Sequence, residues 1–183
     1  MKYAVVAFSL AAIVGLAGCA SNAQPRPVVV PHATFADAAA NEFIKSSRDA
    51  ISRLVAGLDT SSFSPVLVAT VVDVNDLRQA KPLGRTLSEQ YATSLVASGF
   101  AVKEMKLRGD VFVRETTGEL MLSREVQDIA RVHNATTVLV GTYSVASQFT
   151  FVSLKLVSTS TGQIVRAYDY ALPNNADVRA LLR

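Results

Sequence analysis

The sequence predicts an α/β (α+β) domain with a single mixed sheet of about five strands, two parallel crossovers, then an antiparallel meander, and helices covering the sheet. Helix-like and strand-like segments alternate over 35–133, which is typical of parallel strands joined by crossover helices. Strand-like segments then follow one another over 136–172, the last two joined by a Thr161-Gly162 turn. All of this lies in about 150 residues, enough to bury a core.

The first elements are a helix and a strand. Thr34, with Asp37 three residues later, predicts a capping box. Apolar residues at three- and four-residue spacing extend the predicted helix over 35–58. The run VLVATVVDV (66–74) predicts a strand buried on both faces, and the polar residues 75–82 predict a loop.

The next pair repeats this order. An apolar residue at every fourth position predicts a helix over 84–98, and Gly99 suits the left-handed position after it. Residues 100–108 predict a strand, whose alternation slips between Val102 and Met105 and predicts a bulge or twist.

The remaining elements complete the order. Ser123, Asn134 and Asn175 suit helix ends. The predicted ranges are a loop or hairpin at 109–120, a helix at 124–133, strands at 136–145, 148–158 and 163–172, and a short helix ending at Leu182.

The first 18 residues resemble a secretory signal. Lys2 precedes a 16-residue uncharged run that ends at Gly18. This run is short for a membrane span, which needs roughly 18 or more apolar residues. It ends in LAGC (16–19), which resembles the bacterial lipobox. That resemblance implies that the thiol of Cys19 receives diacylglycerol, that the chain is cut before Cys19, and that an N-acyl lipid is added.

The predicted organisation is therefore a signal peptide at 1–18, a lipidated Cys and flexible tether at 19–33, and a domain at 34–183. Three prolines in the tether exclude a packed helix there. Ala20 follows the cysteine in place of the Asp that retains enteric lipoproteins at the inner membrane. The resemblance thus implies a lipid anchor in the outer membrane, with the domain facing the periplasm.

The composition argues against several classes of protein. The formal net charge is +3 and the basic residues are dispersed, so we expect no nucleic-acid binding. A single cysteine excludes a disulfide within the chain. His32 and His133 lack neighbours at metal-ligand spacing, and nucleophile-elbow, P-loop and dinucleotide motifs are missing. We therefore predict no enzyme, no metal and no cofactor, and we expect His133 to meet a helix C-terminal dipole.

Two features leave alternatives open. Asp73 and Asp76 stand at the C-terminal end of a predicted strand, where α/β proteins bind ligands. They suit acid–base work or a cation, or a solvated loop in which Asp76 caps a turn. Phe149 and Phe151 share one face of a strand, which is either a docking surface or a face covered by a helix.

Several segments together resemble the FlgO family of flagellar outer-membrane proteins of Gram-negative bacteria, over roughly residues 37–182. The most specific are LGRTLSEQ (83–90), GELMLSR (118–124) and VGTY (140–143). The resemblance implies a non-enzymatic role in flagellar stability and motility near the basal body. It implies partners among other accessory flagellar proteins, such as FlgP, and leaves a homo-oligomer open.

Two arginines in these segments open predicted helices, where the helix dipole is positive. Arg85 therefore predicts a carboxylate partner among Asp73, Asp76 and Glu119, in a structural clasp. Arg124 is expected to pair with Glu119. A solvated surface position is the alternative for Arg85.

Two other functions stay open. One is a lipoprotein of an envelope transport or secretion apparatus, with an α/β domain like the amino-terminal domain of TolB. The other is a hydrolase, which would need His133 within hydrogen-bond reach of an exposed Ser and an Asp in a cleft.

Overall fold

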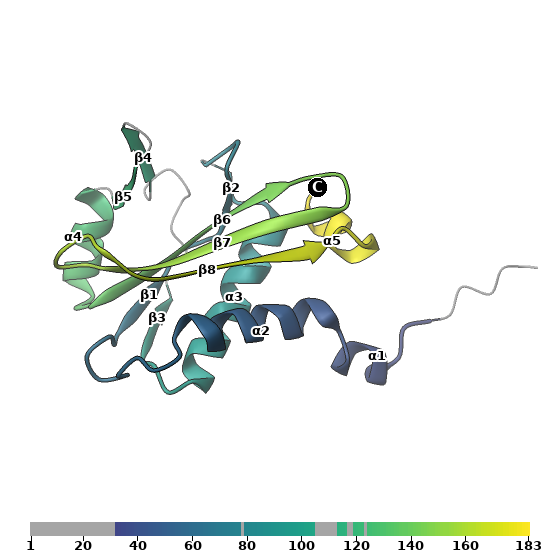
Figure 1. Cartoon of the computed structure of the whole chain (residues 1–183), viewed down its shortest axis with the longest axis horizontal. Coiled ribbons are helices and arrows are strands. Elements are labelled where there is room, and N and C mark those ends of the chain that lie inside the picture. Colours follow the sequence, from purple (N-terminus) through teal and green to yellow (C-terminus); the bar gives the residue numbers. More distant parts are fainter. Residues whose placement is uncertain (1–31, 78, 105–112, 117–118, 123) are drawn as a thin grey trace, which may run out of the picture. The chain divides into compact units, whose positions relative to one another are not determined.

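The computed structural model describes residues 32–77, 79–104, 113–116, 119–122 and 124–183. The chain divides into two units, Met1–Ala33 and Thr34–Arg183, and the described helices and strands belong to the second (Figure 1). The predicted signal peptide, Cys19 and all but the last two residues of the predicted tether lie outside the described residues.

The order of the elements agrees with the prediction. The helices are α1 (Phe35–Ala39), α2 (Glu42–Leu54), α3 (Pro82–Ala97), α4 (Arg124–Val132) and α5 (Ala176–Leu181). The strands are β1 (Val66–Val68), β2 (Val72–Asp73), β3 (Val102–Glu104), β4 (Val113–Thr116), β5 (Glu119–Leu122), β6 (Thr137–Val145), β7 (Phe149–Ser158) and β8 (Ile164–Pro173).

The mixed sheet is confirmed. Its strand order is β3-β1-β6-β7-β8, and β2 also pairs with β6. Strand β1 is parallel to β3 and to β6, whereas β6, β7 and β8 form an antiparallel meander. The described part of this sheet has six strands rather than about five, because one predicted strand is interrupted. Strands β4 and β5 form a separate antiparallel hairpin, as the hairpin alternative predicted.

The predicted strand over 66–74 is broken into β1 and β2. Val68 pairs with Leu139 and Val72 pairs with Thr142, so three residues of the broken strand lie opposite two of β6. This extra residue is a bulge in a parallel pair. The prediction of one continuous strand was therefore wrong.

Helix α3 causes the break. A Cβ added at Gly84 would lie 1.8 Å from the carbonyl oxygen of Val71, so the helix backbone rests directly on the chain there. The Oγ of Ser88 accepts the N–H of Val71 at 2.9 Å and lies 3.2 Å from the carbonyl oxygen of Ala69. The same Oγ also lies 2.8 Å from the carbonyl oxygen of Gly84, to which it can donate its one proton, so the N–H of Val71 is the freed backbone group that is bonded to the helix.

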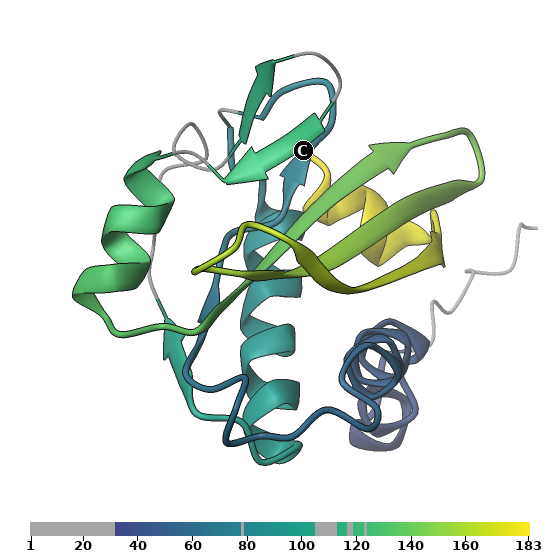
Figure 2. The same ribbon diagram turned by 60° about the vertical axis from the view of Figure 1, so that its left-hand side comes forward.

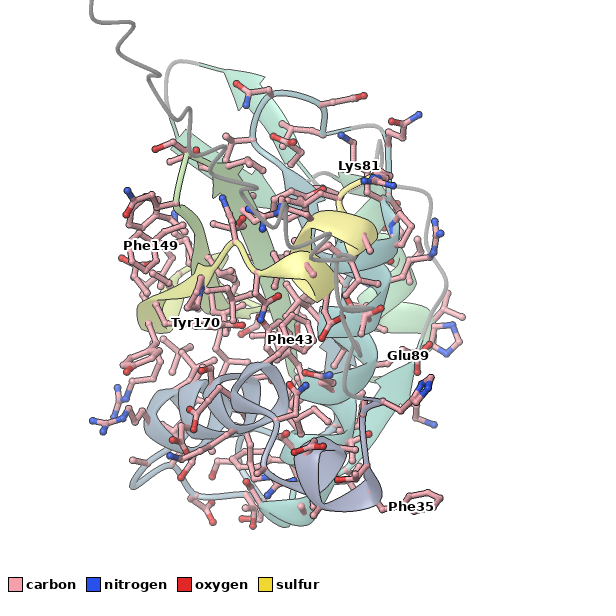
Figure 3. The ribbon with its side chains drawn as sticks, turned by 90° about the vertical axis from the view of Figure 1, so that its right-hand side faces the viewer. Phe35, Phe43, Lys81, Glu89, Phe149 and Tyr170 are labelled. Atoms are coloured by element: carbon pink, nitrogen blue, oxygen red, sulfur yellow. The ribbon has the colours of Figure 1, made fainter. Side chains whose placement is uncertain are left out.

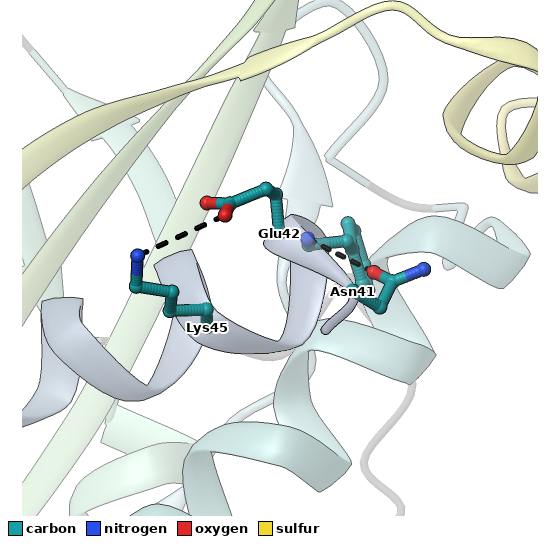
Figure 4. A network of polar contacts seen from close by, with 4 residues as sticks. Asn41, Glu42 and Lys45 are labelled. Atoms are coloured by element: carbon teal, nitrogen blue, oxygen red, sulfur yellow. Dashed lines mark hydrogen bonds and ion pairs between the residues drawn. The ribbon is translucent and has the colours of Figure 1, made fainter. Parts of the chain in front are cut away.

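The predicted helix over 35–58 is two helices. The capping box is confirmed, because Thr34 Oγ1 accepts the N–H of Asp37 at 3.2 Å while the carboxylate of Asp37 accepts the N–H of Thr34 at 2.8 Å. A second start follows at Asn41, whose Oδ1 accepts the N–H of Phe43 at 3.0 Å (Figure 4). The helical stripe continues through this region, so the sequence pattern did not reveal the second cap.

The other helix ends mostly agree with the prediction. Helix α3 begins at Pro82, two residues early, since proline suits the first helical position. Gly99 and Asn134 have φ of +89° and +51° after α3 and α4. Asn175 Oδ1 accepts the N–H of Val178 at 2.9 Å. The bulge predicted near Met105 and the cap predicted at Ser123 lie outside the described residues.

The two faces of the sheet are covered differently. Helices α2, α3 and α5 pack on the first face, around buried residues such as Tyr91, Leu139 and Leu154 (Figures 1 and 2). The second face carries a smaller cluster, in which Ala130 of α4 packs with Val138 and Val157. Because side chains alternate along a strand, Leu139 and Val138 face opposite sides.

A buried tyrosine and a partly buried one join two elements on the first face. The hydroxyls of Tyr91 in α3 and Tyr170 in β8 are hydrogen-bonded, and Figure 3 shows where Tyr170 lies in the domain. Burial raises the pKa of both phenols above the ordinary value. The pair is therefore neutral and structural at physiological pH.

Candidate functional site

A groove of about 490 Å³ lies on the second face of the sheet, where the parallel strands end. Register places six of its residues in two rows across β6, β7 and β8. The rows are Thr142–Ser153–Asp169 and Ser144–Phe151–Ala171. Val74, just after β2, borders the groove, and its N–H donates to Tyr143 O at 2.9 Å. We call this feature the open-face groove.

The open-face groove exposes apolar side chains. Val74 is 46 % exposed and Phe151 is 53 % exposed. Phe149, next on the same face and labelled in Figure 3, is 43 % exposed. The centroids of the Phe149 and Phe151 rings are 6.5 Å apart. Helix α4 covers only the other end of this face, around Val138. Among the described residues, no helix covers these two phenylalanines, and their side chains are exposed.

Three hydroxyls of the open-face groove have no protein partner in the described part of the chain. Thr142, Ser144 and Ser153 are half-buried, and no hydrogen bond reaches their side chains there. By contrast, the hydroxyls of Thr137 and Thr150 on the same strands each donate to a protein oxygen, at 2.8 and 2.7 Å. The groove therefore keeps hydrogen-bonding capacity that the fold itself does not use.

A second cavity, of about 630 Å³, lies at the opposite end of β6. Unlike the hydroxyls of the open-face groove, two of its hydroxyls are hydrogen-bonded to the backbone. Thr137 donates to Phe63 O, and Thr159 donates to Ala135 O, each at 2.8 Å. This cavity is a polar junction of loops rather than a free binding surface.

Asp73 and Asp76 lie at the strand end beside the groove. Asp73 is buried, and its Oδ1 accepts the backbone and side-chain N–H groups of Asn75 at 2.9 and 3.2 Å. The N–H of Asp76 donates to Asp73 O at 3.1 Å. The side chain of Asp73 therefore stabilises this turn.

Tyr143 lies on the other face of β6 from the groove hydroxyls. Its hydroxyl is buried and has no hydrogen-bond partner among the described residues. Burial, then the negative charges of Asp73 and Asp76, raise the pKa of Tyr143 to about 12. Asp73 is in register with Tyr143, so its side chain lies on the Tyr143 side of the sheet, away from the groove hydroxyls. No group of three or more His, Cys, Asp or Glu that suits a metal ion occurs in the described ranges.

The clasp predicted for Arg85 and Arg124 stays a prediction. Arg85 is exposed, and its guanidinium donates to Ala80 O. The ion pairs Glu42–Lys45 and Asp128–Arg131 each lie within one helix, and neither involves Arg85. The side chains of Glu119 and Arg124 lie outside the described part of the structure, and so does their predicted pair.

The two histidines lie far apart in the sequence, at residues 32 and 133. His32 is exposed at the start of the described chain. His133 follows α4, and its N–H donates to Ile129 O at 3.0 Å, at the C-terminal end where the dipole is negative. Within the described part, no hydrogen bond joins its side chain to a Ser or an Asp, as the hydrolase hypothesis would need.

The groove residues were only partly found from the sequence. Phe151 was singled out and Ser153 was expected on the same face of its strand, but Thr142, Ser144 and Asp169 were not identified as site residues. A signal was present, because polar residues alternate with buried ones on β6 and β7. The sequence alone does not give the register of β6, β7 and β8, and it is this register that places the residues side by side.

These features define a class: a small mixed-sheet domain with an open groove and, among the described residues, no catalytic set. The chain belongs to the FlgO family, whose model, FlgO protein, matches residues 48–177. No curated protein matches it. No helix in the described ranges is both long and apolar enough to cross a bilayer.

Solved structures are similar to this chain at low sequence identity. The LpoB C-terminal domain from Salmonella enterica is 18 % identical, with a TM-score of 0.50, over 69 % of this chain and 94 % of that one. The Escherichia coli domain is also 18 % identical, with a TM-score of 0.49, over 72 % and 98 %. A PelC dodecamer from Paraburkholderia phytofirmans, a point variant, is 16 % identical, with a TM-score of 0.46, over 66 % and 82 %. The first of these likenesses supports the fold alone.

Proposed function

We propose that this protein is a lipid-anchored accessory protein of the bacterial flagellum, which supports flagellar assembly, stability and motility by binding other proteins. Membership of the FlgO family is the observation that carries the proposal. The pattern at Cys19 adds an anchor of covalent diacylglycerol and N-acyl lipid in the outer membrane, with the domain in the periplasm. Two or more acyl chains hold a protein stably on a bilayer.

The site supports a binding role over an enzymatic one. The open-face groove offers apolar side chains and hydroxyls, and His133 is not joined to a Ser or an Asp in the described contacts. Accessory flagellar proteins such as FlgP are the partners this proposal favours. A self-assembled ring is compatible with it but is not required.

Genetic complementation tests the proposal. A deletion strain should swim poorly while growing normally, and the wild-type gene should restore swimming. Cys19→Ser should lose incorporation of labelled palmitate, leave the outer-membrane fraction and fail to restore swimming. Ala20→Asp is the matched control, because it keeps the lipid and alters only the sorting signal.

Other outcomes are equally informative. Normal swimming and normal filament number in the deletion strain would refute the flagellar role. A defect in envelope export with normal swimming would favour a transport or secretion lipoprotein instead. Palmitate on Cys19→Ser would refute the anchor.

A further inference from the structure

We propose that an extended segment of another protein adds to the sheet as a further strand, beside residues Ala167–Ala171 of β8. The inference deepens the proposed function and rests on it only for the partner being a protein. It is argued from the hydrogen-bond pattern of β8, from the way in which both ends of this strand are closed to pairing, and from the open stretch between them.

The hydrogen-bond pattern turns part of the backbone of β8 outward. Strand β8 is the last in the order of the described sheet, beside β7 (Figure 1). In an antiparallel pair, alternate residues bond to the neighbouring strand, and the residues between them point their N–H and C=O groups the other way. The N–H of Asn174 donates to Gln148 O at 2.8 Å, which fixes the phase of this alternation. The residues that point their backbone groups away from β7 include Ala167, Asp169 and Ala171.

These three residues form an open row of backbone donors and acceptors. Within the described part of the chain, no hydrogen bond reaches their N–H or C=O groups from a protein partner. All three are exposed. Two of them are alanines, whose methyl groups leave the backbone accessible. A row of alternate free N–H and C=O groups is what an added strand recognises, because the main chain of the partner can bond to each of them.

Both ends of β8 are closed to such pairing. At the first end, the guanidinium of Arg166 donates to Val165 O at 3.0 Å, beside the shift in register. At the other end, Pro173 has no N–H, and its carbonyl oxygen accepts the N–H of Asn175 at 2.8 Å. Charged side chains, bulges and prolines are the means by which proteins keep edge strands from pairing. They bound the stretch from Ala167 to Ala171 without covering it.

The open row is held in place by the core. Leu172 is 1 % exposed on the first face, and the hydroxyl of Tyr170 is bonded to that of Tyr91 in α3. The strand is therefore ordered before a partner arrives, so that binding does not have to order β8 as well. Asp169 and Ala171 also line the open-face groove, so side chains of an added strand would continue that surface.

A second copy of this chain fits the row poorly. The antiparallel pairing of two copies that uses all three residues places the two Asp169 carboxylates opposite each other, and like charges directly opposite are destabilising. A shift in one direction brings Val165 opposite Ala171, although the carbonyl of Val165 is already bonded. A shift in the other direction brings Pro173, which has no N–H, opposite Ala167. A different chain, with a side chain other than a carboxylate opposite Asp169, avoids these conflicts.

Fluorescence anisotropy with the full-length lipoprotein in detergent tests the inference. The probe is a labelled peptide of sequence SVTVKVTVS, whose lysine can lie opposite Asp169. Two derivatives are compared with it: one is N-methylated at the lysine and both threonines, and the other at three of the valines. In an added strand, only one of these two sets of N–H groups faces β8. We therefore expect one derivative to bind about tenfold more weakly or less, and the other to bind as the parent does.

Substitutions in β8 complete the design. Ala171→Pro removes an outward N–H that the pairing with β7 does not use, and an edge strand tolerates proline at such a position. It should weaken binding of the parent peptide about tenfold. Ala171→Ser is the matched control, because it keeps the N–H, and its binding should equal that of the wild type. Ala167→Pro is the second variant at the same edge, for the case that Ala171→Pro lowers the melting temperature.

Four results would overturn the inference. They are no binding of the parent peptide, an equal response of the two N-methylated derivatives, unchanged binding by both proline variants, and displacement of the peptide when the protein self-associates. The last of these would assign the edge to a second copy. None of the measurements depends on swimming, so the flagellar proposal can stand when this inference fails.

Discussion

Gly84 sets how closely α3 approaches the sheet. In an exposed helix, Gly→Ala is stabilising by up to about 1 kcal/mol. Here the added Cβ would lie 1.8 Å from Val71 O and 2.9 Å from its carbonyl carbon, so helix and strand must separate. We predict that Gly84→Ala lowers the free energy of unfolding by about 3 kcal/mol in urea titrations.

Val96→Ala is the control for that variant, because Val96 is 59 % exposed on the same helix. It should change the stability by less than about 0.5 kcal/mol. A neutral or stabilising Gly84→Ala would mean that the contact with Val71 is not close in solution.

Tyr143 gives a pH-dependent prediction. Its folded pKa is about 12, against about 10 in the unfolded chain. The folded state therefore holds the phenolic proton more tightly. The stability this contributes is present below pH 10 and is lost as the pH rises from 10 to 12. We predict that stability falls less steeply over this interval in Tyr143→Phe than in the wild type.

Urea titrations at several pH values check this difference. Tyr91 and Tyr170 also have raised pKa values, but they are present in both proteins and cancel in the comparison. At pH 7 the substitution should change stability by less than about 1 kcal/mol, since the hydroxyl has no partner in the described contacts. Parallel curves above pH 10 would contradict the assignment.

At the scale of elements, β8 is an edge of the sheet. It has ten residues, whereas most strands have about 5–6. Long edges invite pairing with another chain, and charged side chains and bulges oppose it. The guanidinium of Arg166 donates to Val165 O at 3.0 Å, and the register shifts between Leu156 and Val157.

We therefore predict that Arg166→Val raises the dimer fraction several-fold in size-exclusion chromatography with light scattering. Arg48→Val, at an exposed position on α2, is the matched control, and its dimer fraction should equal that of the wild type. A monomeric Arg166→Val would show that the bulge alone protects the edge.

The elements also show what the sequence can predict. Caps at Thr34 and Asn175 and the turn residue Gly99 follow from local chemistry, and all three were found. The break between β1 and β2 depends on contacts of Val71 with Gly84 and Ser88, which lie in the next helix. A pattern read over a few neighbouring residues cannot reveal contacts between segments that are this far apart in the chain. The groove was only partly found for the same reason, since strand pairing brings the residues of β6, β7 and β8 together.

At the scale of the whole molecule, the main core lies entirely within the second unit. Its members run from Phe43 to Leu182. We predict that the fragment 34–183 melts within about 3 °C of the full chain, which corresponds to about 1 kcal/mol at this size. Circular dichroism of both proteins checks this, and a much lower melting temperature of the fragment would show that the first unit contributes to stability.

Helix α1 has a mechanical consequence. None of its five residues is buried, whereas α2 buries Ser47, Ala50, Ile51 and Leu54. A pull on the chain before Thr34 would therefore uncoil α1 first and lengthen the chain by about 1 nm. Single-molecule pulling would record this as a small extension before the main unfolding event. The first helix thus works as an extensible link that absorbs tension before the load reaches the packed domain.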